Sequence, residues 1–445
     1  MTENKSKEKF DIKHTFFIGL AFFTTGISWS LYNTRVNQQL DNYFAGFVLA
    51  GLAVGILMAL DNMLGVFIQP IMGTVSDNTR SKYGRRIPYI IVGVICSAIF
   101  FALIPTGFLP TGNLPILLIW MLFFSLSMGF YRSQAVALMP DFVKPQHRSK
   151  ANAIINIMGG IGAIVAYTMG LASGVLGLQL TFIIASIIMV VALLVLVLTV
   201  NENDAYSYKL LLETEAKEGK VKEKKEKVGL VNSFKDILNE EDKSTLFILL
   251  AIFAWFIGYQ GLEAFFSIYA ASGPNGVLNQ TDAFASFMFN FVAIPFILAA
   301  FPLSLLASRI GRKRCIQIGL IIMILSMLIG FLIQTLTVTM IVLVLFGIGW
   351  AFVNINSIVI VWELAPNVKK IGTYTGLYYF FSVLAAIIGP GIVGGLRDIF
   401  GPGSLLFDGL LFFVVAFIFV YFVKRGEVEL TDEEKIARKK AIEEL

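Results

Sequence analysis

The stretch from Asp61 to Ile90 reads DNMLGVFIQPIMGTVSDNTRSKYGRRIPYI, and it decides the fold. It runs from an apolar helix with one carboxylate, Asp61, into a short charged turn, and then into a second apolar helix that begins near Pro88. Charges this dense are costly to place in hydrocarbon, so the turn marks a membrane face. Pro88 suits the first turn of the second helix, because its missing N–H is not needed there. The stretch therefore predicts two membrane-spanning helices joined by a tight polar loop.

The composition is that of a membrane protein. Of the 445 residues, 57% are hydrophobic and only 15% are charged, whereas soluble proteins carry about 25% charged residues. The net charge of +5 is no nucleic-acid signal, because the place of the charges matters more than their sum. Cys96 and Cys315 both fall in apolar runs, so we expect small core side chains and no disulfide framework.

Twelve segments are long and apolar enough to span a membrane, since a spanning helix needs about 20 mostly apolar residues. The predicted spans are 16–36, 45–75, 87–108, 114–140, 151–171, 178–200, 246–271, 283–307, 315–333, 338–362, 373–395 and 405–423.

The basic residues predict the orientation. Of the 35 Lys and Arg residues, all but Arg35, Arg132 and Arg397 fall in segments that lie on one side when the N-terminus is placed inside. Such a bias sets membrane topology. We therefore expect a multi-pass protein of a bacterial-type plasma membrane, with both termini cytoplasmic.

The two halves of the chain resemble each other. Helix 2 leads into GRR at 84–86, and helix 8 leads into a shortened copy, GRK at 311–313. Helix 4 ends in PD at 140–141, and helix 10 ends in WE at 362–363. Such parallel repeats place a substrate site near mid-membrane, between the halves.

These patterns predict an all-α membrane protein with twelve transmembrane helices, arranged as two six-helix bundles related by pseudo-two-fold symmetry. The predicted parts are an N-terminal bundle (1–200), a charged cytoplasmic linker (201–243), a C-terminal bundle (244–424) and a cytoplasmic tail (425–445). The linker has mixed charge, which is typical of a solvated tether, with a docking or regulatory role as the alternative.

The charged turn, with its pattern G-x-x-x-D-x-x-R-x-x-x-G-R-R at 73–86, resembles the loop between helices 2 and 3 of major facilitator superfamily transporters. With QPI at 69–71 and PYI at 88–90, it is similar to the glycoside:cation symporter branch, especially sucrose and maltose carriers. The resemblance covers residues 12–424 and is strongest in 60–165. It implies a charge network that latches the cytoplasmic helix ends. The residues expected in this latch are Asp77, Arg85, Arg86, Asp141, Arg148, Glu363 and Lys369. The simpler alternative is that the positive charges only anchor the topology.

Few ionisable residues lie at depth, and such residues are functional candidates because lipid disfavours them. Asp61, Arg132 and Glu263 are the predicted proton-coupling residues. Asp61 is interpreted either as a proton carrier or sugar ligand, or as a polar group bonded to a neighbouring helix. Arg132 is either a partner of Asp61 or a sugar contact. Glu263 is a second proton or sugar site, or the partner of Arg35 in an outer gate, since both lie late in the equivalent helices 1 and 7. Arg35 could otherwise snorkel to the outer interface.

Protons are favoured over sodium as the coupling ion. Melibiose permease, a more distant relative by resemblance, uses carboxylates on helices 2 and 4 to bind sodium, and the matching positions here hold Gly65, Gln69 and Arg132. Hard cations need oxygen ligands, and an Arg would repel them. We expect no resident cofactor and no metal, since His14 and His147 are far apart.

Sugars are bound by aromatic stacking and by side-chain hydrogen bonds, which selects a set of substrate candidates. Helices 1 and 7 offer aromatic and amide residues at matched positions, and helices 4, 10 and 11 add more. The candidates are Trp29, Tyr32, Asn33, Tyr131, Gln134, Trp255, Tyr259, Gln260, Asn354, Asn356 and Tyr378. Packing or an interfacial belt is the alternative for each aromatic.

These observations together predict a proton-coupled importer of a sugar or glycoside, such as sucrose or maltose, that works by alternating access. The expected partners are the sugar and the lipid bilayer, with no nucleic acid, and the protein is expected to be a monomer. The alternatives are a proton-coupled exporter of amphipathic compounds and a non-transporting sensor or scaffold. An enzyme is disfavoured, because no hydrolytic, phosphate-binding or metal motif occurs in the sequence.

Overall fold

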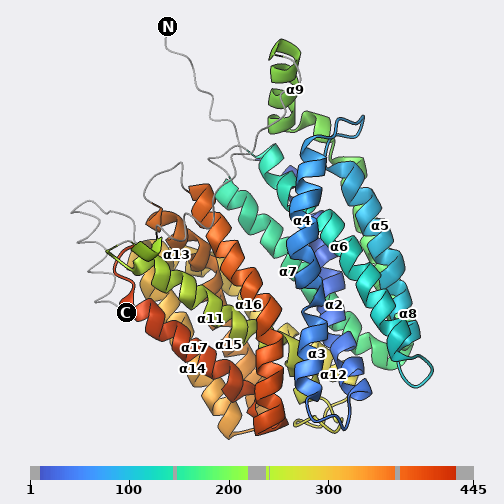
Figure 1. Ribbon diagram of the computed structural model, residues 1–445, viewed down its shortest axis with the longest axis vertical. Coiled ribbons are helices and arrows are strands. Elements are labelled where there is room, and N and C mark those ends of the chain that lie inside the picture. Colours follow the sequence, from blue (N-terminus) through green and yellow to red (C-terminus); the bar gives the residue numbers. More distant parts are fainter. Residues whose placement is uncertain (1–10, 144–147, 219–236, 240, 366–370, 427–445) are drawn as a thin grey trace. The chain divides into compact units, whose positions relative to one another are not determined.

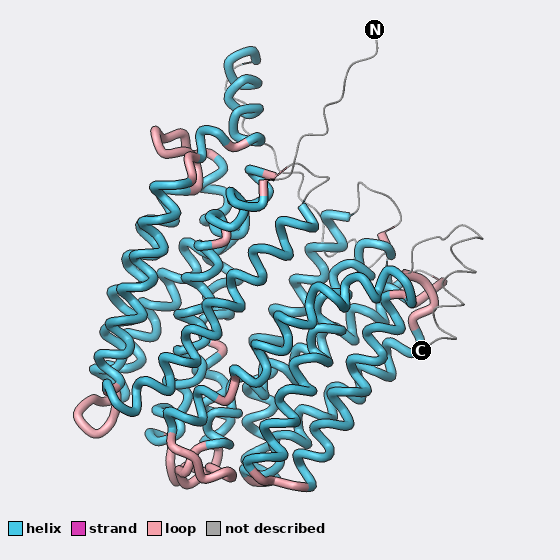
Figure 2. Tube along the Cα trace, turned by 180° about the vertical axis from the view of Figure 1, so that it is seen from behind, coloured by secondary structure: helices cyan, strands magenta, loops and turns pink. Residues whose placement is uncertain are grey.

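The computed structural model describes residues 11–143, 148–218, 237–239, 241–365 and 371–426. Within these residues the chain is helical, without a named strand (Figure 2). Twelve helical segments are long and apolar enough to cross a membrane, so the predicted fold class and number of spans are confirmed. In the first half the helices are α1 (Ile12–Ile18), α2 (Leu20–Tyr43), α3 (Ala50–Met58), α4 (Leu60–Asp77), α5 (Ile87–Leu103), η1 (Ile104–Gly107), α6 (Leu114–Phe142), α7 (Arg148–Leu176) and α8 (Leu178–Thr199).

The second half is preceded by η3 (Glu202–Asp204) and α9 (Tyr206–Glu218), which follow α8 directly. Its spans are α11 (Ser244–Ala270), α12 (Asp282–Phe287) with α13 (Asn290–Ile310), α14 (Arg312–Leu332), α15 (Leu336–Leu364), α16 (Ile371–Phe400) and, after η5 (Pro402–Ser404), α17 (Leu405–Phe422) (Figure 1).

Two glycines make equivalent turns in the two halves. Gly84 has φ +97°, and Gly311 has φ +99°. Residues with a Cβ rarely adopt this left-handed region, so glycine is needed at both positions. The predicted repeat of GRR at 84–86 and GRK at 311–313 therefore has a glycine with positive φ at the same position in each copy.

The structure divides into two compact units that differ from the predicted bundles. One comprises Met1–Ser30, Leu64–Ala166 and Leu176–Glu223, and the other comprises Leu31–Met63, Tyr167–Val175 and Lys224–Leu445. The end of span 1 and the start of span 2 (Leu31–Met63) pack with the second half of the sequence. The compact units therefore differ from the bundles that the sequence repeat predicts. The bundle boundaries at 200 and 244 stay a prediction.

Each unit has its own packed interior and an apolar outer surface. In the first unit, the Phe101 ring lies 4.6 Å from Phe182 and 5.2 Å from Phe124, between centroids, and joins α5, α6 and α8. Other large apolar side chains are exposed, such as Leu198 at 84% and Phe301 at 70%. An apolar exterior suits a protein whose solvent is lipid.

Candidate functional site

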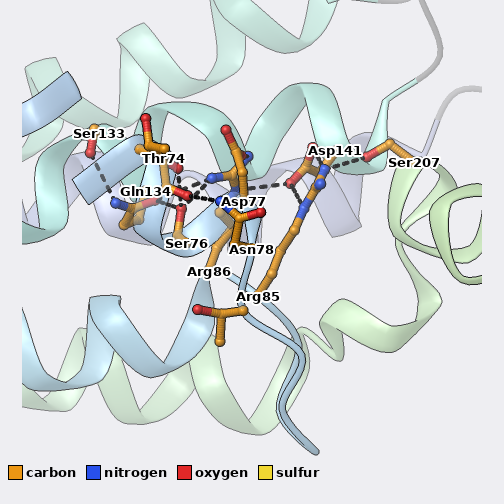
Figure 3. Close-up of polar contacts among 12 residues, drawn as sticks. Thr74, Ser76, Asp77, Asn78, Arg85, Arg86, Ser133, Gln134, Asp141 and Ser207 are labelled. Atoms are coloured by element: carbon orange, nitrogen blue, oxygen red, sulfur yellow. Dashed lines mark hydrogen bonds and ion pairs between the residues drawn. The ribbon is translucent and has the colours of Figure 1, made fainter. Parts of the chain in front are cut away.

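The charged loop after α4 and the end of α6 build a buried cluster of four charges. Arg85 binds Asp141 with two bonds, Nη2–Oδ1 at 2.7 Å and Nε–Oδ2 at 3.2 Å. Arg86 bridges Asp141, at 3.2 Å from Nε to Oδ2, and Asp77, at 2.5 Å from Nη2 to Oδ1. The four side chains are only 8% to 14% exposed. Figure 3 shows both arginines reaching across to Asp141. We call Asp77, Arg85, Arg86 and Asp141 the charge cluster; the structure brings together these four predicted latch residues.

Gln134 completes the charge cluster. Its Oε1 accepts a hydrogen bond from Ser76 Oγ at 2.6 Å and a long one from Arg86 at 3.4 Å (Figure 3). Arg86 also donates to Ser76 Oγ. Gln134 is fully buried and its acceptor is occupied by these donors, which favours a structural role; its role as a sugar ligand stays a prediction.

Glu202 adjoins the charge cluster and was missed by the sequence reasoning. Both of its carboxylate oxygens accept from the backbone N–H of Arg86, at 2.8 and 2.7 Å, and one also accepts from Ile87 at 2.8 Å. The acid thus caps the N-terminus of α5, where backbone donors have no helical partner. A Cβ at Gly84 would collide with it. Burial raises the pKa of Glu202 despite these hydrogen bonds. A carboxylate just past a predicted span, opposite a basic loop, was the only signal in the sequence.

The start of the predicted linker is docked on the same loop. In α9, Glu215 forms a two-bond ion pair with Arg80, at 2.6 and 3.0 Å. Ser207 Oγ donates to Asp141 Oδ1 at 2.8 Å and accepts from Arg85 at 3.2 Å. Residues 202–218 are therefore an ordered extension of the charge cluster, so the interpretation as a plain tether does not hold for this part.

The second half contains a smaller counterpart of the charge cluster. Arg312, directly after Gly311, lies 3.4 Å from Glu363 at the end of α15, between Nη1 and Oε1. This pair matches Arg85–Asp141 in position but is more exposed, at 22% and 32%. The side chain of Arg148 and the predicted partner Lys369 lie outside the described residues.

Two carboxylates are buried in the second unit. Glu263 on α11 lies within hydrogen-bonding reach of Asn33 on α2 and interacts electrostatically with Asp61. All three side chains are at most 8% exposed. Asp61 stands in the first turn of α4, just after the break that separates α4 from α3, and its Oδ1 accepts from Asn62 N at 2.7 Å. The structure thus groups two predicted coupling residues with one predicted sugar ligand.

Arg132 and Trp29 form a second grouping, in the first unit. The guanidinium carbon of Arg132 lies 4.9 Å from the Trp29 ring centroid, which is a cation–π contact. The neighbouring Tyr131 points elsewhere: its ring packs against Gly93 on α5, and its hydroxyl lies 3.3 Å from Thr25 Oγ1. Tyr131 is fully buried in this packing, which favours the packing alternative, and its role as a sugar contact stays a prediction.

The aromatic candidates of the second half lie in packed clusters. Tyr259 stacks on Trp350 of α15, with centroids 4.2 Å apart and planes at 13°. Tyr378 lies against Phe256 and shares a hydrogen bond with Ser357 at 3.2 Å. Trp255 and Tyr32 are fully buried. These contacts and this burial favour packing for Trp255, Tyr32 and Tyr378. Tyr259 is only half-buried, so it remains a candidate for sugar contact.

The amide candidates differ from one another. Asn356 is buried, and one of its two amide N–H groups donates to the Phe352 carbonyl of its own helix at 2.8 Å, so it is less available than the more exposed amides. Asn354 and Gln260 are half-buried, and Gln260 lies beside Gly389 of α16. Of the predicted amides, Asn33, Asn354 and Gln260 therefore remain suitable for a ligand.

Arg35 does not pair with Glu263 in this structure. Its Nη1 donates to Gln38 Oε1 at 2.7 Å, and its nearest counter-charge is Asp282 at the start of α12. The helices themselves are in contact, because Ser267 Oγ on α11 donates to the Thr34 carbonyl at 3.0 Å. Arg35 points toward Gln38 and α12, so the predicted Arg35–Glu263 gate is not formed although α2 and α11 touch.

Spans 2 and 8 each have a short helical irregularity, at Ala59 and at Met288–Phe289, which the sequence reasoning also missed. The irregularity before α4 precedes Asp61, and the one before α13 precedes Asn290. Asn290 is 3% exposed, and its Oδ1 has no hydrogen-bond partner among the described residues. Among the residues that the structure describes, no group of three or more His, Cys, Asp or Glu could hold a metal.

Comparisons with known proteins agree with this architecture. Lactose permease of Lactobacillus helveticus is 30% identical over 98 residues, which cover 22% of this chain and 13% of the permease. A sucrose transport protein of Arabidopsis thaliana is 30% identical over 128 residues, which cover 25% of this chain and 21% of that protein. The matched part thus spans less than a quarter of the length of either relative.

Solved structures share the fold at low sequence identity. The nucleoside transporter NupG has a TM-score of 0.68 at 15% identity, over 92% of this chain and 100% of that one. A bacterial homologue of the human lysosomal transporter Spinster has a TM-score of 0.61 at 16% identity, over 98% of this chain and 99% of that one.

A family model completes the comparison. The model for the Major Facilitator Superfamily matches residues 15–276 and 270–444, which is nearly the whole chain. Together with the twelve spans and the repeated charged loops, this match shows that the chain belongs to the major facilitator superfamily of membrane transporters.

Proposed function

We propose that this protein is a secondary active transporter that imports a sugar or glycoside together with a proton, by alternating access. The names of its partial relatives, a lactose permease and sucrose transport proteins, support a sugar as the substrate class. The distribution of Lys and Arg supports a plasma-membrane orientation with both termini inside. The absence of a phosphate-binding motif from the sequence favours an ion gradient over ATP as the energy source.

The observation that carries the proposal is the grouping of Asp61, Glu263 and Asn33. Two carboxylates that interact in a buried site repel each other when both are ionised, so together they hold a proton readily. Loss of that proton leaves two like charges with little water around them. The pair can therefore load a proton from one side of the membrane and release it to the other. Asn33 supplies an amide for either a carboxylate or a sugar hydroxyl.

Arg132 and Trp29 supply a complementary sugar-binding pair in the first unit. An indole face suits the apolar face of a pyranose, and a guanidinium donates hydrogen bonds to hydroxyls. The contact between them holds the arginine in place. We assign sugar recognition to this pair, with Asn33, Tyr259, Gln260 and Asn354 as further candidates.

Uptake into proteoliposomes tests the proposal. The purified full chain is reconstituted, a pH gradient (inside alkaline) is imposed, and uptake of radiolabelled sucrose, maltose and lactose is measured. We expect at least one disaccharide to accumulate and a proton uncoupler to abolish accumulation. Asp204→Asn is the matched control, because Asp204 lies in an exposed pair with Lys209 at 2.9 Å and should leave uptake unchanged.

Three outcomes are possible that each contradict a different part of the proposal. Uptake that survives the uncoupler but requires sodium overturns proton coupling. Proton-driven efflux of amphipathic dyes, without sugar uptake, identifies an exporter. No transport of any probe, from protein shown to be folded by its thermal transition, overturns the transporter assignment in favour of a sensor.

A further inference from the structure

The second unit contains a buried arginine between two acidic groups at its outer end. We use "outer end" for the end formed by Tyr43, Ala50, Ala270 and Phe400, which the Lys and Arg distribution predicts to be extracellular. Arg397, near the end of α16, is 4% exposed. Its Nη1 lies 3.4 Å from Asp41 Oδ1 on α2, and the pair's side chains are 3% and 6% exposed.

Further contacts hold this pair in place. Arg397 Nη2 donates to the Asn275 carbonyl at 3.1 Å, and the Asn275 side chain donates to both oxygens of Asp41, at 3.0 and 3.1 Å. The guanidinium also lies 5.3 Å from the centroid of the Phe265 ring. Asp41 thus comes from the first half of the sequence, and every group that holds it comes from the second half.

A second carboxylate of the same half is linked to Arg397 through the turn at Gly401, whose N–H donates to the Arg397 carbonyl at 2.8 Å and whose carbonyl accepts from Ser404 Oγ at 2.9 Å. Asp408 in the first turn of α17 is fully buried and interacts electrostatically with Arg397. Its Oδ2 accepts from Ser404 Oγ at 2.6 Å, but its Oδ1 has no partner among the described residues. Arg397 Nε is likewise buried without a partner in the part that the structure describes. Both groups therefore have unused hydrogen-bonding capacity.

The neighbouring Asp398 ties the same helix to α3. Its two oxygens accept from Gly51 N at 2.7 Å and from Leu52 N at 2.9 Å, which caps α3, whose own N-cap residue Leu49 offers no side-chain bond. The helices touch through small residues, since a Cβ at Gly55 would collide with the Pro390 carbonyl. The end of α16 therefore holds α2 through Arg397 and α3 through Asp398.

We propose that Arg397 exchanges ion-pair partners in an outer gate. It binds Asp41 while the outer end is closed, and it binds Asp408 when Asp41 moves away. This inference rests on the proposed alternating access. A buried charge left unpaired is strongly destabilising, so a gate that only broke Asp41–Arg397 would open with difficulty. Asp408 stays beside Arg397 on the same half and lowers that cost. The other charged group that faces Arg397 is Asp398, which is engaged with α3.

The proposal predicts opposite effects for two aspartates on one arginine. Asp41→Asn weakens only the closed state, so it increases the open fraction. Asp408→Asn removes a carboxylate that contributes most when Asp41 is gone, so it decreases the open fraction. A merely structural Asp408 would not produce this opposite sign.

Distances between two spin labels measure the open fraction directly. Labels are placed at Val48→Cys, in the exposed turn before α3, and at Ser272→Cys, in the exposed loop after α11, with Cys96 and Cys315 replaced by Ala. The full chain is studied in nanodiscs without substrate, in a Gly55→Leu background that weakens the α3–α16 contact and populates both states. Asp204→Asn is the matched charge-removing control and should leave the distances unchanged.

We expect Asp41→Asn to raise the ratio of long to short distances about tenfold and Asp408→Asn to lower it by a similar factor, within the usual range of coupling between sites. Asp408→Glu should stay near the background value. An Asp408→Asn ratio that is unchanged or raised overturns the proposal. If that variant does not fold, Asp408→Thr replaces it under the same criterion. Because no sugar is used, failed transport with these shifts intact would contradict the proposed substrate and not the gate.

Discussion

Asp141 accepts hydrogen bonds from three side chains that come from two other segments, Arg85, Arg86 and Ser207. A carboxylate has enough lone pairs for all of them, whereas an amide keeps only one oxygen. The two arginines are buried, so they depend on Asp141 and Asp77 for neutralisation. This makes Asp141 the residue whose loss should disturb the charge cluster most.

We expect Asp141→Asn to lower the stability of the first unit by about 3–5 kcal/mol, the usual cost of removing one partner from a buried ion pair. The measurement is the thermal unfolding of the purified full chain in detergent. Glu363→Gln is the matched comparison, because its pair with Arg312 is more exposed and should cost about 1 kcal/mol or less. Equal losses for the two variants would contradict this account.

At the scale of residues, the sequence predicted the positions of charged side chains better than the positions of neutral polar side chains. Asp77, Arg85, Arg86 and Asp141 were predicted together because hydrocarbon excludes dense charge, which confines all four to one membrane face. Gln134 and Tyr131 were assigned to the sugar, because their positions on an apolar helix do not reveal which face they occupy. The partners that decide their roles, Ser76 and Thr25, lie on other helices.

Among the elements, α9 shows how much of the charge cluster comes from outside the charged loop. Its Glu215 binds Arg80, and the preceding η3 brings Glu202 to the N-terminus of α5. The composition of residues 201–243 indicated only a solvated linker, since a docked charged helix and a free one have similar sequences. The paired turns at Gly84 and Gly311 were predictable, because a positive φ selects glycine in both repeats.

Glu215→Gln should release α9 from the charged loop, because the two-bond pair with Arg80 is lost. We expect backbone amides of 206–215 to exchange with deuterium at least about tenfold faster, which corresponds to roughly 1.4 kcal/mol of local opening free energy. Glu213→Gln, on an exposed side chain of the same helix, is the matched control. Equal exchange in both variants would show that the ion pair does not hold the helix.

Glu202, in η3, gives the capping of α5 a pH dependence. Burial raises its pKa, so the folded state favours the neutral acid more than the unfolded state does. Its contribution to stability is therefore full below the ordinary Glu value of about 4.3 and declines as the pH rises through the raised pKa. We expect the melting temperature of the parent, relative to Glu202→Gln, to fall as the pH is raised from about 4.5 toward neutral. A difference that is constant with pH, or that rises, would contradict the sign.

Across the whole molecule, the sequence predicted the number of spans, the repeat and the place of a buried carboxylate, because each follows from hydrophobic length or charge cost. It did not predict which acids meet. Asp61 and Glu263 are about 200 residues apart in the sequence. Hydrophobic periodicity predicts the helices but not which helices pack against each other. The outer gate was assigned to Arg35 for the same reason, whereas a buried ion pair between the halves joins Arg397 and Asp41.

Substitutions of Asp61 or Glu263 should separate sugar exchange at equal pH from accumulation driven by a pH gradient. Asp61→Asn keeps the shape of the side chain and one acceptor oxygen but removes the charge that repels Glu263, so a proton is no longer needed for the buried pair to be stable. We expect the variant to exchange labelled for unlabelled sugar at equal pH at a rate near that of the parent, and to lose at least about tenfold in accumulation under a pH gradient. Glu263→Gln should behave in the same way, because either substitution leaves one carboxylate, and Asp204→Asn should match the parent in both assays. Parent-like accumulation by Asp61→Asn would show that Asp61 is structural, and loss of exchange as well would place it in sugar binding.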